Sequence, residues 1–218
     1  MNPILLAGLS LTLAGLAAGL GAAFVSHRLP ELELGAKPRR YLVMPVAFAV
    51  AGAAAAVVTA WRWDGQVLIA VMTALLFWQL MLIAVIDAEN HWLPDIVTAP
   101  LAVTGIIAAI ILPSPPAQIW QIALISGAFG FIALWGLSFI YSKVRGHSGL
   151  GGGDPILLGA GAVWVGALDL PLVMLVASVV GLGSVVLLRV AGRDVGLGTR
   201  IPYGTYLALG FAVAWILS

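Results

Sequence analysis

Long apolar segments, separated by short polar connections, account for most of this sequence. Of the 218 residues, 62% are apolar and 9% are charged, whereas a soluble domain has roughly 45–50% apolar and about 25% charged residues. A helix needs about 20 apolar residues to cross a bilayer, and open strands cannot satisfy their backbone groups in lipid. The sequence therefore predicts an all-α, multi-pass integral membrane protein.

Eight apolar segments are candidate transmembrane helices, and the sixth of them is the shortest. They are Pro3–Ser26, Tyr41–Ala60, Val67–Ile86, Ile96–Leu112, Ile119–Tyr141, Ile156–Leu168, Leu172–Leu188 and Tyr203–Leu217. No basic residue precedes the first apolar run, which favours a first span over a cleavable signal peptide. Since no internal repeat or separable soluble region is visible, we predict one integral membrane domain over residues 1–218, with about eight transmembrane helices.

Lysine and arginine are concentrated in alternate connections. The connections after the first, third, fifth and seventh segments hold Arg28, Lys37, Arg39, Arg40, Lys143, Arg145, Arg189, Arg193 and Arg200. The opposite connections hold only Arg62. Because basic loops stay in the cytoplasm, this pattern predicts that both termini lie outside and that the basic connections are cytoplasmic.

The composition also excludes several kinds of site. The net charge of +1 gives no basis for a nucleic-acid partner. The absence of cysteine excludes disulfides, thiolate zinc sites and a cysteine nucleophile. The three histidines, His27, His91 and His147, lack the spacing of metal ligands. We therefore expect neither a metal nor a cofactor, and the lipid bilayer as the surrounding partner.

Four acidic residues occur in two connections that are predicted to lie at the cytoplasmic face. Asp87, Glu89 and Asp95 are in one and Asp154 is in the next, so Asp87 and Asp154, 67 residues apart (154 − 87), could meet. Helix capping alone would explain Asp154, which precedes a proline, and Asp95, which follows one. It does not explain Asp87, because the negative end of the helix dipole disfavours a carboxylate. An ionisable group at a membrane boundary without a structural role suggests function.

A glycine-rich stretch, GHSGLGGGDP, leads into Asp154. A flexible linker would also be rich in glycine, whereas a phosphate-binding loop would need the G-K-[ST] sequence that is absent here. Alternatively, the glycines allow a backbone to pass close to the site. Two carboxylates brought together can act as a base on water and as an acid on a carbonyl. That is the chemistry of aspartic peptidases, and it needs no cysteine, metal or cofactor.

Three motifs resemble those of the type IV prepilin peptidases, which are membrane aspartic peptidases with a GxGD signature. GLGGGD resembles that signature. IDAENHWLPDIVT, residues 86–98, resembles the first aspartate motif, in which an Asp is followed by a second acidic residue and then by L-P-D-x-x-T. IPYGTYLALG, residues 201–210, resembles the last span, usually I-P-F-G-P-Y-L-A. GAAFVSHRLPE, residues 21–31, weakly resembles the end of the first span.

The resemblance implies what the chain does and where. It implies cleavage of the basic leader from prepilins or pseudopilins, after a glycine and before a long apolar helix, at the cytoplasmic face of a bacterial inner membrane. Such substrates serve type IV pili and type II secretion systems. It also implies a catalytic pair, Asp87 and Asp154, with supporting motif residues Gly151, Gly153, Glu89, Pro94 and Asp95.

The chain departs from the family pattern at three points. Many members also methylate the new N-terminus and carry paired C-x-x-C motifs between the first two spans, but here residues 28–40 form a short loop without cysteine. We therefore predict no N-methyltransferase activity. The residue two positions after the second Asp, often Lys, is Ile156, and the usual Pro of the last motif is Thr205. Neither change touches the proposed pair.

Two other classes of function are alternatives. A proton-coupled transporter would place ionisable groups near the bilayer midplane, whereas the interiors of the predicted spans carry no charged residue. A structural membrane subunit whose aspartates only cap helices would leave Asp87 unexplained. The sequence therefore favours a peptidase that acts at the membrane surface.

Overall fold

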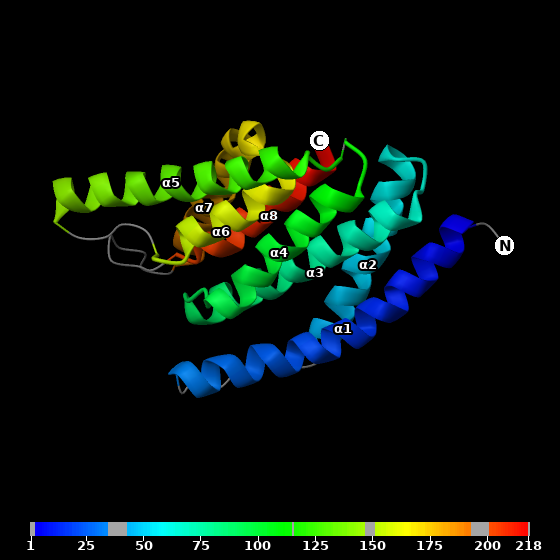
Figure 1. Ribbon diagram of the computed structural model, residues 1–218. Coiled ribbons are helices and arrows are strands. Elements are labelled where there is room, and N and C mark those ends of the chain that lie inside the picture. The colour runs from blue at the N-terminus through cyan, green and yellow to red at the C-terminus, as the bar shows by residue number, and fades with distance from the viewer. Residues whose placement is uncertain (1–2, 35–42, 115, 147–150, 193–200, 218) are drawn as a thin grey trace. The chain divides into compact units, whose positions relative to one another are not determined.

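The computed structural model describes residues 3–34, 43–114, 116–146, 151–192 and 201–217, and within these ranges every regular element is a helix (Figure 1). The helices are α1 (Pro3–Leu34), α2 (Val43–Arg62), α3 (Val67–Asn90), α4 (Asp95–Ile111), α5 (Trp120–Arg145), α6 (Asp154–Val165), the short 3-10 helix η1 (Ala167–Asp169), α7 (Leu170–Val190) and α8 (Tyr203–Leu217). Each predicted segment corresponds to one α-helix, which confirms the predicted helical fold class.

Five segments of the described chain are long and apolar enough to cross a membrane. They lie in α1, α2, α3 and α5 and in Ala167–Val190, which contains α7. The other three helices are apolar but shorter, with 17 residues in α4, 12 in α6 and 15 in α8. A full crossing needs about 20 residues, so the eight crossings and their sidedness stay predictions.

Five helices end later than predicted: α1 by eight residues (34 − 26), α3 and α5 by four (90 − 86 and 145 − 141), and α2 and α7 by two (62 − 60 and 190 − 188). α1 continues to Leu34, so residues 28–34 of the expected 28–40 loop are helical, because leucine and glutamate predominate there and favour helix. Residues 35–40 lie outside the described residues. α3 continues to Asn90, whose side-chain amide donates to the Ile86 carbonyl at 3.0 Å. The next residue, His91, has a φ of 52° and ends the helix in the left-handed conformation.

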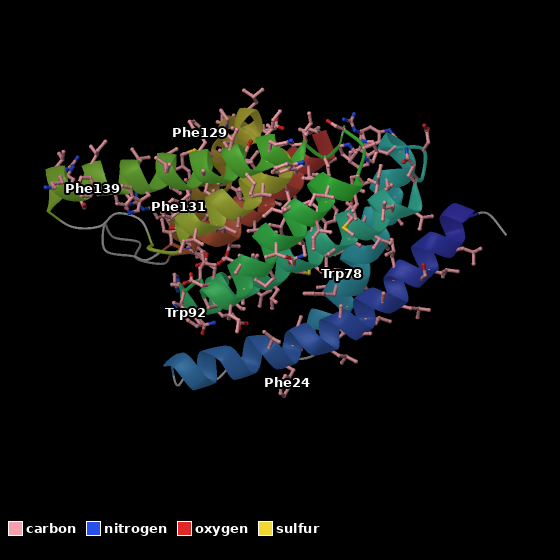
Figure 2. All side chains as sticks on the ribbon, in the orientation of Figure 1. Phe24, Trp78, Trp92, Phe129, Phe131 and Phe139 are labelled. Carbon is pink, nitrogen blue, oxygen red and sulfur yellow. The ribbon has the colours of Figure 1, made fainter. Side chains whose placement is uncertain are left out.

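The chain forms two compact units, Met1–Asn90 and His91–Ser218. In the first, α1, α2 and α3 pack on one another. A Cβ on Gly15 of α1 would be 2.5 Å from the Phe48 carbonyl oxygen of α2, so the two backbones nearly touch. The indole N–H of Trp78 on α3 donates to the same carbonyl at 2.9 Å (Figure 2). Small residues and interhelical hydrogen bonds of this kind hold membrane helices together.

In the second unit, α6 is the central helix. α4, α5 and α8 all pack against it, and eleven of its twelve residues are buried. Glycines allow this close approach. A Cβ on Gly159 would be 3.0 Å from the Cβ of Phe131 on α5, and one on Gly161 would overlap the ring of Phe211 on α8. α6 is therefore fixed on several sides, and so is the side chain at its start.

Candidate active site

Asp154 is the first residue of α6, and its side chain is 4% exposed. Its Oδ2 accepts a hydrogen bond from the Gly151 backbone N–H at 3.0 Å, and its own N–H donates to the Gly151 carbonyl at 3.2 Å. These two bonds form a tight turn directly before the helix. Because a helix N-terminus carries partial positive charge, the helix end and the N–H donor both favour the ionised carboxylate.

The expected capping pattern is wrong at both aspartates that precede helices. Gly153 is the N-cap of α6, so Asp154 and Pro155 occupy the first two helical positions. The carboxylate of Asp154 turns back onto Gly151, which a forward-facing cap would not do. In α4, Pro94 is the N-cap and Asp95 is the first helical residue, because Pro94 already has the extended backbone of an N-cap residue (φ −77°, ψ 139°).

The three glycines before Asp154 have different surroundings. A Cβ on Gly153 would be 2.6 Å from the Cβ of Leu93, and one on Gly151 would be 3.1 Å from Oδ2 of Asp154. A Cβ on Gly152 would meet nothing within 4 Å. Leu93 belongs to the first aspartate motif, so Gly153 brings part of that motif directly against the second one. The glycine at position 153 thus makes room for another segment of this chain, the one that contains Leu93.

The other residues of the first motif lie on either side of the boundary between the two units. Asp87 is in the last turn of α3, is 5% exposed, and has no basic residue in that turn. This is the position at the negative helix end that the sequence predicted. Glu89 is exposed in the same turn. Pro94 is buried and Asp95 is exposed, and both belong to the second unit with Asp154. The pairing of Asp87 with Asp154 remains a prediction.

Polar side chains hold the end of α6 that is opposite Asp154. The amide of Gln118 donates to the carbonyls of Ala162 at 3.2 Å and Val163 at 3.1 Å. The hydroxyl of buried Ser126 in turn donates to Oε1 of Gln118 at 2.9 Å. The Ala162 carbonyl also accepts the Gly166 N–H at 2.9 Å, so Gln118 gives that carbonyl a second donor and supplies one to Val163 near the end of α6.

Trp164 connects the same end of α6 to two neighbouring helices. Its indole N–H donates to the Leu101 carbonyl of α4 at 2.8 Å. Its ring meets that of Trp215 on α8 edge to face, with 5.5 Å between the ring centroids. Gly105 of α4 makes room for the indole, because a Cβ there would be 2.8 Å from Cδ1 of Trp164. These contacts fix the axial position of α6 and hence of Asp154.

Tyr203, to which the sequence analysis assigned no role, lies near Asp154. It is the first residue of α8 and forms a side-chain hydrogen bond with Ser178 of α7. Asp154 is close enough for its charge to act on the Tyr203 phenol. The motif IPYGTYLALG was the available signal, but the sequence alone did not show which of its side chains would approach the aspartate.

The part of the chain that the structure describes offers no set of metal ligands. No group of three or more His, Cys, Asp or Glu residues is close enough together there to hold a metal ion. His147 lies outside those residues. The polar groups that the structure describes around the start of α6 include the Asp154 carboxylate, the Gly151 backbone N–H that donates to it and the Tyr203 phenol.

Comparison with known proteins gives the family. The sequence model of the type IV leader peptidase family matches residues 74–186, which is 113 of the 218 residues (186 − 74 + 1). The chain belongs to the type IV leader peptidase family. The matched region of this leader peptidase family member contains both Asp87 and Asp154, whereas Tyr203 lies beyond it.

Several curated relatives are similar to this member of the family. It is 35% identical over 164 residues to the prepilin leader peptidase/N-methyltransferase of Pseudomonas putida, covering 72% of this chain and 54% of that protein. It is 36% identical to the protein of the same name from Pseudomonas aeruginosa, covering 65% and 48%. It is 39% identical to a type 4 prepilin-like proteins leader peptide-processing enzyme of Escherichia coli, covering 58% and 44%. The chain thus spans about half the length of these relatives. No solved structure matches it significantly.

Proposed function

We propose that this chain is a membrane aspartic endopeptidase that removes the basic leader from type IV prepilins or pseudopilins. The observation that carries the proposal is the buried Asp154 carboxylate at the start of the enclosed helix α6, in a member of the leader peptidase family. The names of the relatives support the substrate class. The substrate is a segment with a basic leader, a glycine at the cleavage site and a following apolar helix.

Asp87 and Asp154 form the catalytic pair in this proposal. Both carboxyl groups are buried, and both lie in the region that the family shares. Leu93, against which Gly153 packs, is six residues after Asp87, so chain connectivity limits the Cα separation of Asp87 and Leu93 to roughly 20 Å. Opposite helix ends also support different roles, since a helix start favours an ionised carboxylate and a helix end favours a protonated one.

The reaction follows from those roles. Asp154 takes a proton from water as the water oxygen bonds to the carbonyl carbon of the scissile peptide. Protonated Asp87 gives its proton to the carbonyl oxygen, which yields a tetrahedral diol. Asp154 then passes its proton to the amide nitrogen, the C–N bond breaks, and Asp87 recovers a proton as the new carboxyl group forms. Each of the two carboxyl groups therefore acts as an acid in one step and as a base in the other.

The proposal includes a place for this reaction in the cell. Both termini lie outside, the connections that carry the motifs are cytoplasmic, and the membrane is the bacterial inner membrane. The concentration of nine basic residues in the connections after odd-numbered segments supports that orientation. Residues 1–218 act as one membrane peptidase region, and the products serve type IV pili or type II secretion systems.

The test uses the full chain in lipid vesicles with a synthetic prepilin-type peptide, and mass spectrometry of the products. The parent protein should cleave after the glycine. Asp87→Asn and Asp154→Asn should each lower the rate at least about 100-fold, because each removes one proton-transfer group. Substantial cleavage by either variant would rule out Asp87 and Asp154 as the catalytic pair.

Asp95→Asn is the matched control. It removes an exposed carboxylate from the first position of α4, so cleavage should stay within a few-fold of the parent rate. Circular dichroism and membrane insertion should be unchanged in all three variants. A parent protein that cleaves no such peptide but conducts protons across the vesicle membrane would support the transporter class instead.

A further inference from the structure

Two tyrosines at the start of α8 each form a hydrogen bond with a serine of α7. The hydroxyl oxygens of Tyr206 and Ser184 are 2.5 Å apart, and the Tyr203 side chain forms a hydrogen bond with the Ser178 side chain. The charge of Asp154 acts on Tyr203, whereas Tyr206 lies about one helical turn farther along α8. The two tyrosines are therefore alike in tying α8 to α7 but differ in their relation to the candidate catalytic carboxylate.

The register of α6 against α8 places Tyr203 beside Asp154 independently of that interaction. Gly161 lies against the ring of Phe211, and Trp164 lies against Trp215. The two helices thus run parallel with an offset of 50 to 51 residues (211 − 161 and 215 − 164). Applied to Asp154, the same offset gives positions 204 and 205, next to Tyr203. Figure 1 shows α6 and α8 side by side along this length.

The hydroxyl of Tyr203 has the hydrogen-bonding capacity for a second partner. A tyrosine hydroxyl has one donor proton and can also accept hydrogen bonds. When the Ser178 hydroxyl donates to the Tyr203 oxygen, the tyrosine proton remains for an acceptor on the side of Asp154. Tyr203 is half-buried, so a hydrogen bond there is less weakened by water than one at an open surface.

Other titratable groups on the helices packed against α6 lie farther from Asp154 or are exposed. In the described residues they are Asp95 on α4, Tyr141, Lys143 and Arg145 on α5, Tyr206 on α8 and Asp169 in η1. The α5 groups are exposed and lie beyond the level of Asp154, since Gly127 and Gly130 already face Val163 and Leu158. Asp169 follows the opposite end of α6. Asp87, the proposed partner, belongs to the other unit.

We propose that Tyr203 is a positioning residue for Asp154. Its hydroxyl, anchored by Ser178, donates to the Asp154 carboxylate through one bridging water, and keeps that carboxylate ionised and correctly oriented at lower pH. This inference deepens the proposed function and rests on it for the role of Asp154 as base. The Tyr203 hydroxyl thus sets the pH range in which the peptidase works.

The experiment compares Tyr203→Phe, which removes one oxygen and keeps the ring, with the parent protein. The titration of Asp154 is followed in vesicles by infrared spectroscopy. Its carboxyl signal is identified, for the parent and for each variant, as the band that disappears when Asp154→Asn is introduced into the same protein. Tyr203→Phe should raise the midpoint of that titration by about one pH unit. The acidic limb of the kcat/KM profile should move by the same amount, with kcat at the optimum within a few-fold of the parent value.

Tyr206→Phe is the control, because it removes the equivalent tyrosine–serine hydrogen bond farther along α8. Its Asp154 midpoint should equal that of the parent. The proposal is overturned if Tyr203→Phe leaves the midpoint unchanged, or if Tyr206→Phe moves it equally. The infrared titration needs no substrate, so it still decides the role of Tyr203 if the parent protein fails to cleave a prepilin-type peptide, an outcome that would count against the proposed function alone.

Discussion

Gly153 lies so close to Leu93 that a Cβ at position 153 would be 2.6 Å from the Leu93 Cβ and 3.1 Å from the Leu93 carbonyl oxygen. The glycine before Asp154 is therefore required by the chain's own packing, whatever a substrate requires. The contact joins the LPD portion of the first aspartate motif to the turn that precedes α6. Through it, the segment that contains Leu93 packs directly against the start of the helix that carries Asp154.

Gly153→Ala should disturb this contact. The added methyl group forces the turn and the Leu93 segment apart, and overpacking of this kind typically costs about 1–3 kcal/mol. Both the midpoint of thermal unfolding in detergent and the rate of leader cleavage should fall. Gly152→Ala is the internal control, because its methyl group would meet nothing within 4 Å. Equal damage from the two substitutions would mean that flexibility, and not the Leu93 contact, explains the glycines.

Gln118→Glu tests the polar anchor at the far end of α6. At neutral pH the glutamate offers no donor to the carbonyls of Ala162 and Val163 and adds negative charge at the negative helix end, so the variant should be less stable by about 1–3 kcal/mol. Protonation restores an O–H donor, so the deficit relative to the parent should shrink as the pH falls. Thermal unfolding measured across a pH series checks the sign. A deficit that grows in acid would contradict the assigned hydrogen bonds.

Trp164→Phe should destabilise the second unit by about 1–2 kcal/mol, because it removes the indole donor to Leu101 and reduces the edge contact with Trp215. Trp135→Phe on α5 provides the comparison, since Trp135 is exposed and stacks on Phe139. The exposed substitution should change stability by less than about 0.5 kcal/mol. Unfolding followed by circular dichroism in detergent separates the two, and an equal effect would remove the special role of the Trp164 contact.

No methyl group should be added to the processed N-terminus of the substrate. The reason is the short stretch at residues 28–40, of which 28–34 belong to α1 and which lacks cysteine, although relatives named for both activities are similar to this chain. Mass spectrometry of the product, formed with S-adenosylmethionine present, checks this. A mass gain of one methylene group that depends on the protein would refute the prediction while leaving the peptidase proposal intact.

The helices could be predicted because lipid leaves the chain few choices. Apolar runs such as Ile96–Leu112 and Tyr203–Leu217 reappear as α4 and α8 with little or no change at their ends. Where a helix ends at a different residue from the predicted one, local hydrogen bonds and backbone conformation decide the end, and the length of the apolar segment does not predict them. α3 gains a further turn because Asn90 supplies a donor to Ile86 and His91 adopts a positive φ, and neither event is visible in hydropathy.

The site was harder to predict than the helices. Asp154 lies at a helix start and Asp87 at a helix end, as the bounds of the apolar segments predicted, but capping rules misplaced Asp154 by one position. Whether its carboxylate faces forward or back onto Gly151 depends on the turn as a whole. The proximity of Tyr203 depends on the register of α6 against α8, which Gly161 and Trp164 establish through packing far along the chain.

The twelve residues of α6 rise about 18 Å, well short of the roughly 30 Å of a bilayer's hydrocarbon core. Because α4, α5 and α8 pack against α6 and eleven of its twelve residues are buried, most of its surroundings are other helices and not lipid. A helix of this length can therefore present Asp154 at one end without itself spanning the hydrocarbon core.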